Sequence, residues 1–172
     1  EGSVALLIEA AMAFGTGHHG TTYGCLDALE AMAEAPAPGP VADIGCGTAV
    51  LAMAAARVWP EVPVLASDID PVAVEVAEAN LAANDLAGRV AVLTAAGFDH
   101  PAIAAAAPFG LVFANILKGP LLMLVPDMAR HIAPGGVAIL SGILTGQADE
   151  VRAAYEAGGF VAVSRKDFGD WS

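Results

Sequence analysis

The sequence predicts an α/β fold, in which helices cover both faces of a mostly parallel, twisted sheet. Short runs rich in Val, Ile and Leu alternate with longer Ala-rich stretches of helical pattern. Glycine and proline stand where one kind of run changes to the other, as in Pro134-Gly135-Gly136 and Gly158-Gly159. The length of 172 residues fits one domain with a substantial core.

The alternation divides the chain into six expected strands and five expected helices. The strands are residues 41–44, 64–67, 90–94, 111–114, 137–141 and 160–164. The helices are residues 51–58, 72–84, 121–132 and 147–157, together with one that begins near Tyr23 and ends at Glu34.

The segment before the first strand has a different character. Residues 4–8 read as a short strand, and a glycine-rich loop, AMAFGTGHHGTT, follows them. The loop ends in Thr21-Thr22, and these threonines are expected to cap the helix that begins near Tyr23. The Pro, Ala and Gly connector at residues 36–40 reads either as a loop or as a domain boundary.

A glycine loop follows the first strand directly and opens the next helix. Gly45 and Gly47 allow the backbone to turn tightly and a ligand to lie against it. The spacing is GxGxA and not the GxGxxG that seats a pyrophosphate on a helix N-terminus. Asp43, just before the glycines, would repel a pyrophosphate but attract an ammonium group. The alternative is a structural turn with Asp43 as a capping residue.

Asp68 ends the second strand, 23 residues after Gly45. In an open parallel sheet, ligands bind beyond the carboxyl ends of the strands, and a carboxylate at this point accepts hydrogen bonds from ribose hydroxyls. S-adenosylmethionine has a ribose, no phosphate, a sulfonium and an amino-acid tail, so the pattern suits this cofactor. Asp70, followed by Pro71, is expected to be the N-cap of the next helix.

Asn115 is a polar residue at the carboxyl end of the otherwise apolar run LVFANI. A buried strand rarely ends in an amide without a partner to satisfy it. An amide oxygen at this end of the sheet can accept a hydrogen bond from an amine and aim its lone pair. The alternative is an asparagine that only forms a turn.

Five motifs stand in the order AFGTGHHGTT, DIGCGTAVLA, SDIDPVAVEVAEANLAAN, FANILKGPL and APGGVAILSGIL. Together they resemble the bacterial ribosomal-protein methyltransferases of the PrmA type, over about residues 7–171. Those enzymes methylate large-subunit ribosomal protein eleven. A mitochondrial lysine methyltransferase that acts on an electron-transfer flavoprotein looks similar, so another protein substrate remains an alternative.

The resemblance implies a seven-stranded, Rossmann-like class I methyltransferase fold that binds S-adenosylmethionine. It implies cofactor contacts at Thr22, Gly45, Asp68 and Asn115, and a loop with Phe14, Gly15 and Thr16 that folds over the cofactor. Gly47 and Asp43 belong to the same expected cofactor site. Residues 1–40 are then the N-terminal strand, cofactor loop and helix of the catalytic domain, and residues 41–172 are its cofactor-binding core.

The chain also departs from the family pattern. The family usually has Thr at His18, Pro at Gly20 and Asp at Gly110. Its Asp-Pro-Gly matches residues 9–11, which here read Glu-Ala-Ala. Its separate N-terminal substrate-recognition domain is absent, and its last strand, expected after Trp171, is missing or cut short.

Composition narrows the classes of partner and compartment. A net charge of −12 disfavours nucleic-acid binding and suits a basic protein such as a ribosomal protein, although solubility alone explains the charge equally well. The mean hydropathy is +0.63, but the longest uncharged runs are broken by Pro, Gly or Asn, so no membrane span is expected. Without a leader or a disulfide framework, a cytoplasmic location is expected.

The expected reaction is a direct displacement by a neutral amine in line with the methyl–sulfur bond. Asn115 and the backbone carbonyl of Ile116 would hold the amine, while His19 is either a base or a structural residue. A metal site at His18, His19 and Cys25 matches no zinc signature, so no metal is expected. A nicotinamide-dependent dehydrogenase and a cofactor-binding fragment without activity are the rival functions.

Overall fold

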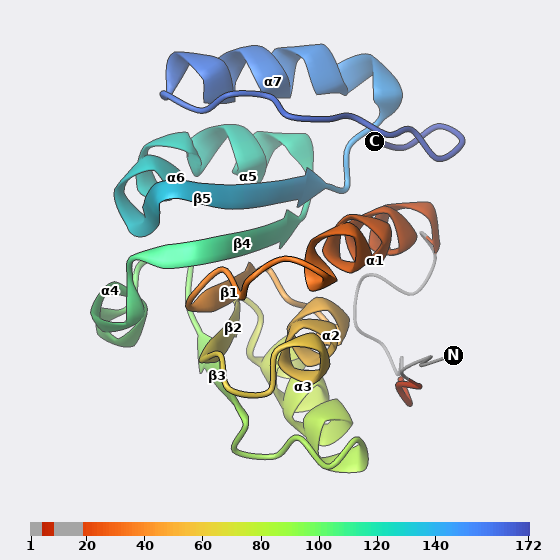
Figure 1. Ribbon diagram of the computed structural model, residues 1–172, viewed down its shortest axis with the longest axis vertical. Coiled ribbons are helices and arrows are strands. Elements are labelled where there is room, and N and C mark those ends of the chain that lie inside the picture. Colours follow the sequence, from red (N-terminus) through yellow and green to blue (C-terminus); the bar gives the residue numbers. More distant parts are fainter. Residues whose placement is uncertain (1–4, 9–18) are drawn as a thin grey trace.

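A computed structural model describes residues 5–8 and 19–172, and its centre is a sheet of five parallel strands (Figure 1). The strands lie side by side in the order β3-β2-β1-β4-β5. Their bounds are β1 Val41–Ile44, β2 Val64–Asp68, β3 Val90–Thr94, β4 Phe109–Asn115 and β5 Ile132–Ser141. The fold class expected from the sequence is therefore confirmed.

Helices cover both faces of the sheet. Those whose side chains join the first core cluster are α1 His19–Ala33, α2 Val50–Val58 and α3 Pro71–Ala83. Those of the second cluster are α4 Pro101–Ala106, α5 Lys118–Met123, α6 Val125–His131 and α7 Ala148–Ala157, which follows the short 3-10 helix Thr145–Gln147. None of the described helices combines the length and the apolar character needed to cross a membrane.

The central strands are buried on both faces, as parallel strands usually are. All four residues of β1 are buried, and its apolar residues are divided between the two core clusters: Val41 joins the first, while Ala42 and Ile44 join the second. The helices contribute many alanines, which allow them to approach the sheet closely. The core is thus built mostly from small aliphatic side chains, and Phe109 and Phe113 are the largest of its fully buried residues.

The strand order reverses between β1 and β4. From β1 the chain winds outward through β2 to β3 and then crosses back to β4 and β5. At such a switch point, the loops that leave the two central strands turn away from each other and open a crevice at their carboxyl ends. This places the loop after β1 next to the end of β4.

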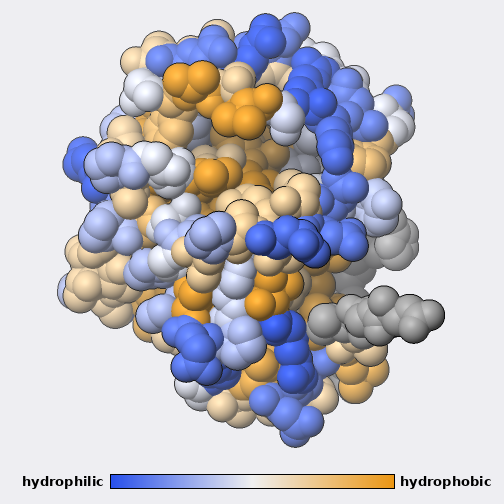
Figure 2. Space-filling model, viewed as in Figure 1, coloured by the Kyte–Doolittle hydropathy of each residue, from blue (hydrophilic) through white to orange (hydrophobic). Residues whose placement is uncertain are grey.

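The first five expected strands are confirmed, but the sixth is wrong. Residues 160–164 run extended without a strand partner, and the side chains of Val161 and Val163 are 83% and 91% exposed. Their β-branched pattern supplies propensity, but a strand also needs a hydrogen-bonded neighbour. β5 lies at the edge of the sheet, and no described strand pairs with its outer side. Beneath α7 on this side, hydrophobic residues gather where the surface is hollowed (Figure 2).

The expected N-terminal strand is also wrong within the described residues 5–8, which form no strand. The side chain of Asn84, at the end of α3, replaces a strand partner for Leu7. Its Oδ1 accepts the N–H of Leu7 at 2.8 Å, and its Nδ2 donates to the Leu7 carbonyl at 2.7 Å. Residues 9–18 of the expected loop lie outside the described part of the chain.

Two helix predictions need correction. Helix α1 begins at His19, so Thr21 and Thr22 lie inside it and do not cap it. The helix expected at residues 121–132 is divided into α5 and α6, because Pro126 cannot continue the hydrogen bonding of the preceding turn. Helix α4 was not predicted; the side chain of His100 caps it by accepting the N–H of Ala102 at 3.1 Å.

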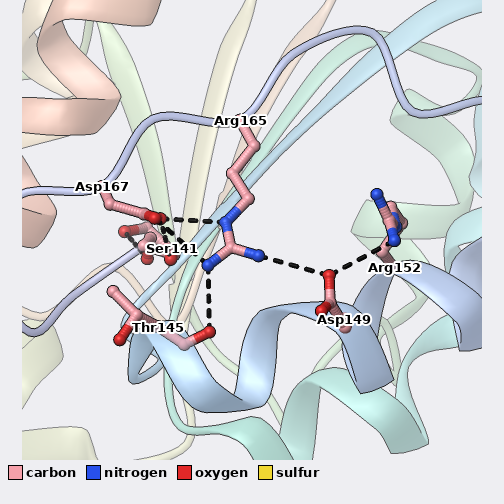
Figure 3. Close-up of polar contacts among 7 residues, drawn as sticks. Ser141, Thr145, Asp149, Arg152, Arg165 and Asp167 are labelled. Atoms are coloured by element: carbon pink, nitrogen blue, oxygen red, sulfur yellow. Dashed lines mark hydrogen bonds and ion pairs between the residues drawn. The ribbon is translucent and has the colours of Figure 1, made fainter.

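The C-terminal residues fold back over α1 and the start of α7. Phe168 packs on α1 so closely that a Cβ on Gly24 would lie 2.8 Å from its ring. Arg165 donates to Asp149, Asp167 and the carbonyl of Thr145 (Figure 3). These ion pairs are exposed, so each contributes little stability by itself. The segment is nevertheless held at several points beside α1.

Candidate functional site

The glycine loop after β1 is anchored to the end of β2. The N–H groups of Gly45 and Cys46 both donate to the carbonyl of Ser67, at 2.8 and 2.9 Å. Gly45 has φ +74°, a conformation that favours glycine, and a Cβ at this position would collide with Cγ2 of Ile116. Glycine at this position therefore allows the loop to turn directly against the end of β4.

Asp68 holds the same loop from β2. Its Oδ2 accepts the N–H of Gly47 at 2.9 Å, and its Oδ1 accepts the N–H of Asp70 at 3.0 Å. Each carboxylate oxygen has a second lone pair, so both can accept further hydrogen bonds, for example from ribose hydroxyls. Asp70 itself accepts the N–H of Val72 and caps α3, which confirms the role expected for it.

Asp43 is buried beneath the glycine loop. Its Oδ2 accepts the N–H of Ala52, in the first turn of α2, at 3.0 Å. Burial raises the pKa of Asp43 to about 7, and the charge of Asp68 adds to the rise, while the hydrogen bond from Ala52 opposes it. The structural role of Asp43 as a helix-capping group is thus present, and its attraction for an ammonium group stays a prediction.

Asn115, the last residue of β4, lies beside α1. Its Nδ2 donates to the hydroxyl oxygen of Thr22 at 3.4 Å, although the two residues are 93 positions apart. With Nδ2 turned to Thr22, Oδ1 is the acceptor end of the amide, and no hydrogen bond to it is found among the described residues. The next residue, Ile116, donates its N–H to the carbonyl of Ser141 at the end of β5, at 3.1 Å.

Several of these residues line one crevice at the carboxyl ends of β1 and β4. Its lining consists of Thr22, Asp43, Gly45, Cys46, Gly47, Thr48, Val50, Leu51 and Asn115. The structure thus brings together the described residues that the sequence predicts for the site. Asp68 adjoins the crevice through Gly47, and Ile116 adjoins it through Gly45. Phe14, Gly15, Thr16 and His18 lie outside the described residues.

Neither cysteine forms a disulfide or lies in a reactive environment. Cys25 and Cys46 are free and buried. Burial raises the pKa of the Cys25 thiol to about 12 and raises that of Cys46 as well, and the charge of Asp43 adds to both rises. Both side chains therefore act as small apolar groups of the core. No group of three His, Cys, Asp or Glu side chains that could hold a metal is found in residues 5–8 and 19–172.

Gly142 is a site residue that the sequence reasoning missed. It follows the carboxyl end of β5, has φ +83°, and packs against Asn115 and Ile116. The signal for it was the same as for Gly45, namely a glycine directly after a parallel strand. The contact itself joins residues from two different strands, which the sequence pattern does not reveal.

The family model that matches this chain and two curated relatives carry the same family name. The model of the family "Ribosomal protein L11 methyltransferase (PrmA)" matches residues 1–172. Ribosomal protein L11 methyltransferase of Brucella abortus (strain S19) is 51% identical over 158 residues, which cover 92% of this chain and 55% of that protein. The protein of the same name from Chelativorans sp. (strain BNC1) is 52% identical over 159 residues, 92% of this chain and 54% of that protein. The chain thus spans about half the length of these relatives.

Solved structures agree with the sequence comparison. The crystal structure of ribosomal protein L11 methylase from Lactobacillus delbrueckii subsp. bulgaricus matches with a TM-score of 0.79 and 30% identity, over 88% of this chain and 74% of that chain. Precorrin-6y C5,15-methyltransferase from Geobacter metallireducens GS-15 matches with a TM-score of 0.66 and 19% identity, over 78% and 69%. The second likeness concerns the fold alone.

Proposed function

Because the chain belongs to the PrmA family of ribosomal protein L11 methyltransferases, we propose that it is the catalytic part of an S-adenosylmethionine-dependent protein N-methyltransferase. Its substrate is a large-subunit ribosomal protein, methylated on amino groups. The observation that carries this proposal is the pairing of Asn115 with Thr22 beside the glycine loop. It leaves an amide oxygen free to accept a hydrogen bond from an amine at the point where a cofactor would end.

The crevice fits the proposed cofactor in three respects. The glycine loop presents bare backbone, since a Cβ on Gly45 would collide with Ile116. Asp68 offers carboxylate lone pairs next to that loop. The carboxylate of Asp43 lines the crevice, and the one hydrogen bond found for it in the described structure comes from Ala52, so a cationic ligand would compensate its charge.

The bound cofactor supplies a methyl group on a positively charged sulfur. The chain has to present the acceptor nitrogen in its neutral form, with the lone pair in line. A lysine amine has a pKa near ~10.4 and an α-amine one near ~7.7–8.0, so deprotonation is the harder problem for lysine. Asn115 Oδ1 and the Ile116 carbonyl can accept two hydrogen bonds from a neutral amine, which leaves its lone pair free for the methyl carbon. The proton leaves the nitrogen to solvent.

The charge of the chain supports the proposed partner, and its cysteines support the proposed location. A domain of net charge −12 attracts basic proteins and repels nucleic-acid phosphates. Two free, buried cysteines agree with a reducing cytoplasm. The contacts of α1 with α2, β4 and β5, and the place of Thr22 in the crevice, support grouping this helix with the cofactor-binding core. Recognition of the ribosomal protein would lie mainly in the part of the relatives that this chain does not match.

Two titrations and one transfer assay test the proposal. Calorimetry with S-adenosylmethionine and with NAD should show binding of the first alone. A version of the protein with the full length of its relatives should transfer radioactive methyl groups to large-subunit ribosomal protein eleven. Binding of NAD would instead support the alternative function, a nicotinamide-dependent dehydrogenase. If the protein binds the cofactor but transfers no methyl group to the ribosomal protein, the proposed substrate is wrong. The protein then either methylates another protein or binds the cofactor without activity.

A further inference from the structure

Gly142 faces the two oxygen atoms that the proposed function assigns to the acceptor amine, and the inference below rests on that function. A Cβ on Gly142 would lie 2.6 Å from the carbonyl oxygen of Ile116 and 3.0 Å from Oδ1 of Asn115. It would also lie 2.8 Å from the Ile116 nitrogen, and real Cβ atoms essentially never come within 3.0 Å of another residue's atom. The bare Cα of Gly142 is therefore a condition for the observed placement of both oxygens.

The same two residues are held from three further directions. The Ile116 N–H donates to the Ser141 carbonyl at 3.1 Å, and the Ile116 side chain packs on Gly45. The Asn115 amide donates to Thr22 at 3.4 Å. Because these contacts come from β5, the β1 loop and α1, the peptide cannot shift away from a new side chain on Gly142 without breaking one of them.

We infer that Gly142 is a positioning residue for methyl transfer. Its missing side chain keeps Asn115 Oδ1 and the Ile116 carbonyl oxygen on the same side, where both can accept hydrogen bonds from one amine. Gly142 does not line the crevice of the glycine loop, so a change here should act on the acceptor amine and not on the cofactor.

Gly135 provides a matched control. It lies in β5 with φ +78°, close to the +83° of Gly142, but a Cβ at Gly135 would have no neighbour within 4 Å. Gly135→Ala and Gly142→Ala therefore introduce similar backbone strain, the first near the start of β5 and the second directly after its end. Only Gly142→Ala adds a methyl group next to Asn115 and Ile116.

The first measurement needs no catalysis. In ¹⁵N spectra of the 172-residue chain, the side-chain amide of Asn115 is assigned by its loss in Asn115→Ala. Gly142→Ala should shift this resonance, and Gly135→Ala should leave it in place. In the unmodified chain, the Ile116 N–H should exchange with solvent as slowly as the amides of β4, a result that does not depend on how well any variant folds.

The second measurement is transfer kinetics. Gly142→Ala should lower kcat by about tenfold or more, the scale expected when a reactant is misplaced, while the Kd for S-adenosylmethionine stays within about threefold. In an Asn115→Ala background, Gly142→Ala should lower kcat much less, because the side-chain amide that it displaces is already absent.

An Asn115 resonance that does not move in Gly142→Ala, or an Ile116 N–H that exchanges freely, overturns the inference whatever the activity. Equal kinetics for Gly142→Ala and Gly135→Ala overturn it as well. If the unmodified enzyme transfers no methyl group, the proposed function fails, and the resonance and exchange data alone decide whether Gly142 fixes the geometry of Asn115.

Discussion

The side-chain amide of Asn115 donates to the hydroxyl of Thr22 across 93 positions of sequence, at 3.4 Å. This contact joins the carboxyl end of β4 to α1 and fixes which end of the amide faces the helix. A hydroxyl can accept from Nδ2 and still donate elsewhere. Thr22 thus sets the orientation of Asn115 in addition to lining the crevice.

Asn115 should act on turnover more than on cofactor affinity. Asn115→Ala removes the proposed hydrogen-bond acceptor of the amine, an interaction expected to be strongest near the transition state, so kcat should fall by about 10²-fold. The Kd for S-adenosylmethionine, measured by calorimetry, should change little by comparison. A variant that keeps its rate and loses only cofactor affinity would show that the assigned role is wrong. The assay uses a version with the full length of the relatives.

Asp68 should act on cofactor affinity. Asp68→Ala should weaken binding of S-adenosylmethionine by roughly 1.5–3 kcal/mol, the usual value of a hydrogen bond to a charged group. Asp70→Ala is the matched control, since it removes a helix cap two residues away and should cost about 1 kcal/mol of stability without changing affinity. Calorimetry that finds unchanged affinity in Asp68→Ala would exclude the ribose contact.

Asp43 should make stability depend on pH. Its pKa in the folded chain, about 7, lies above the ordinary 3.8, so the folded state holds the proton more tightly than the unfolded chain. The contribution of Asp43 to stability is therefore complete below about pH 4 and is lost as the pH rises toward 7. Asp43→Asn should remove this loss, and its gain relative to the unmodified chain should grow by roughly 2–4 kcal/mol between pH 4 and pH 8.

Urea unfolding at the two pH values measures this difference. Asp43→Asn should at the same time weaken cofactor binding at pH 8, because a neutral amide attracts no cation. A gain in stability that is the same at both pH values would mean that Asp43 does not ionise in this range.

The 172-residue chain should bind the cofactor but methylate the ribosomal protein poorly. It matches about half the length of its relatives, and binding energy from remote contacts is what positions a large substrate. Compared with a version as long as its relatives, the 172-residue chain should have a much lower kcat/KM for the ribosomal protein and a similar Kd for the cofactor. Equal kcat/KM for the two would place substrate recognition within these 172 residues.

The sequence was sufficient for the parts of the site that follow directly from strand order. Gly45, Asp68 and Asn115 each stand at the end of a run that reads as a parallel strand, and such ends share one edge of the sheet. The packing of Gly142 on Asn115 and Ile116 could not be predicted in this way, and neither could the hydrogen bonds between Asn84 and Leu7. Both are contacts between residues far apart in the sequence. Residues 160–164 show the opposite error, in which β-propensity was read as a strand although no neighbour pairs with it.

The C-terminal residues that pack on α1 affect the order in which the protein folds. Lys166 pairs with Asp27 of this helix across 139 positions, and Phe168 packs on Gly24. Contacts of such sequence separation form late, since a long loop must close before they stabilise anything. During synthesis, Thr22 leaves the ribosome well before the residues that hold its helix in place. In the nascent protein, the helix that carries Thr22 therefore lacks these contacts until residues 166–168 have been synthesised.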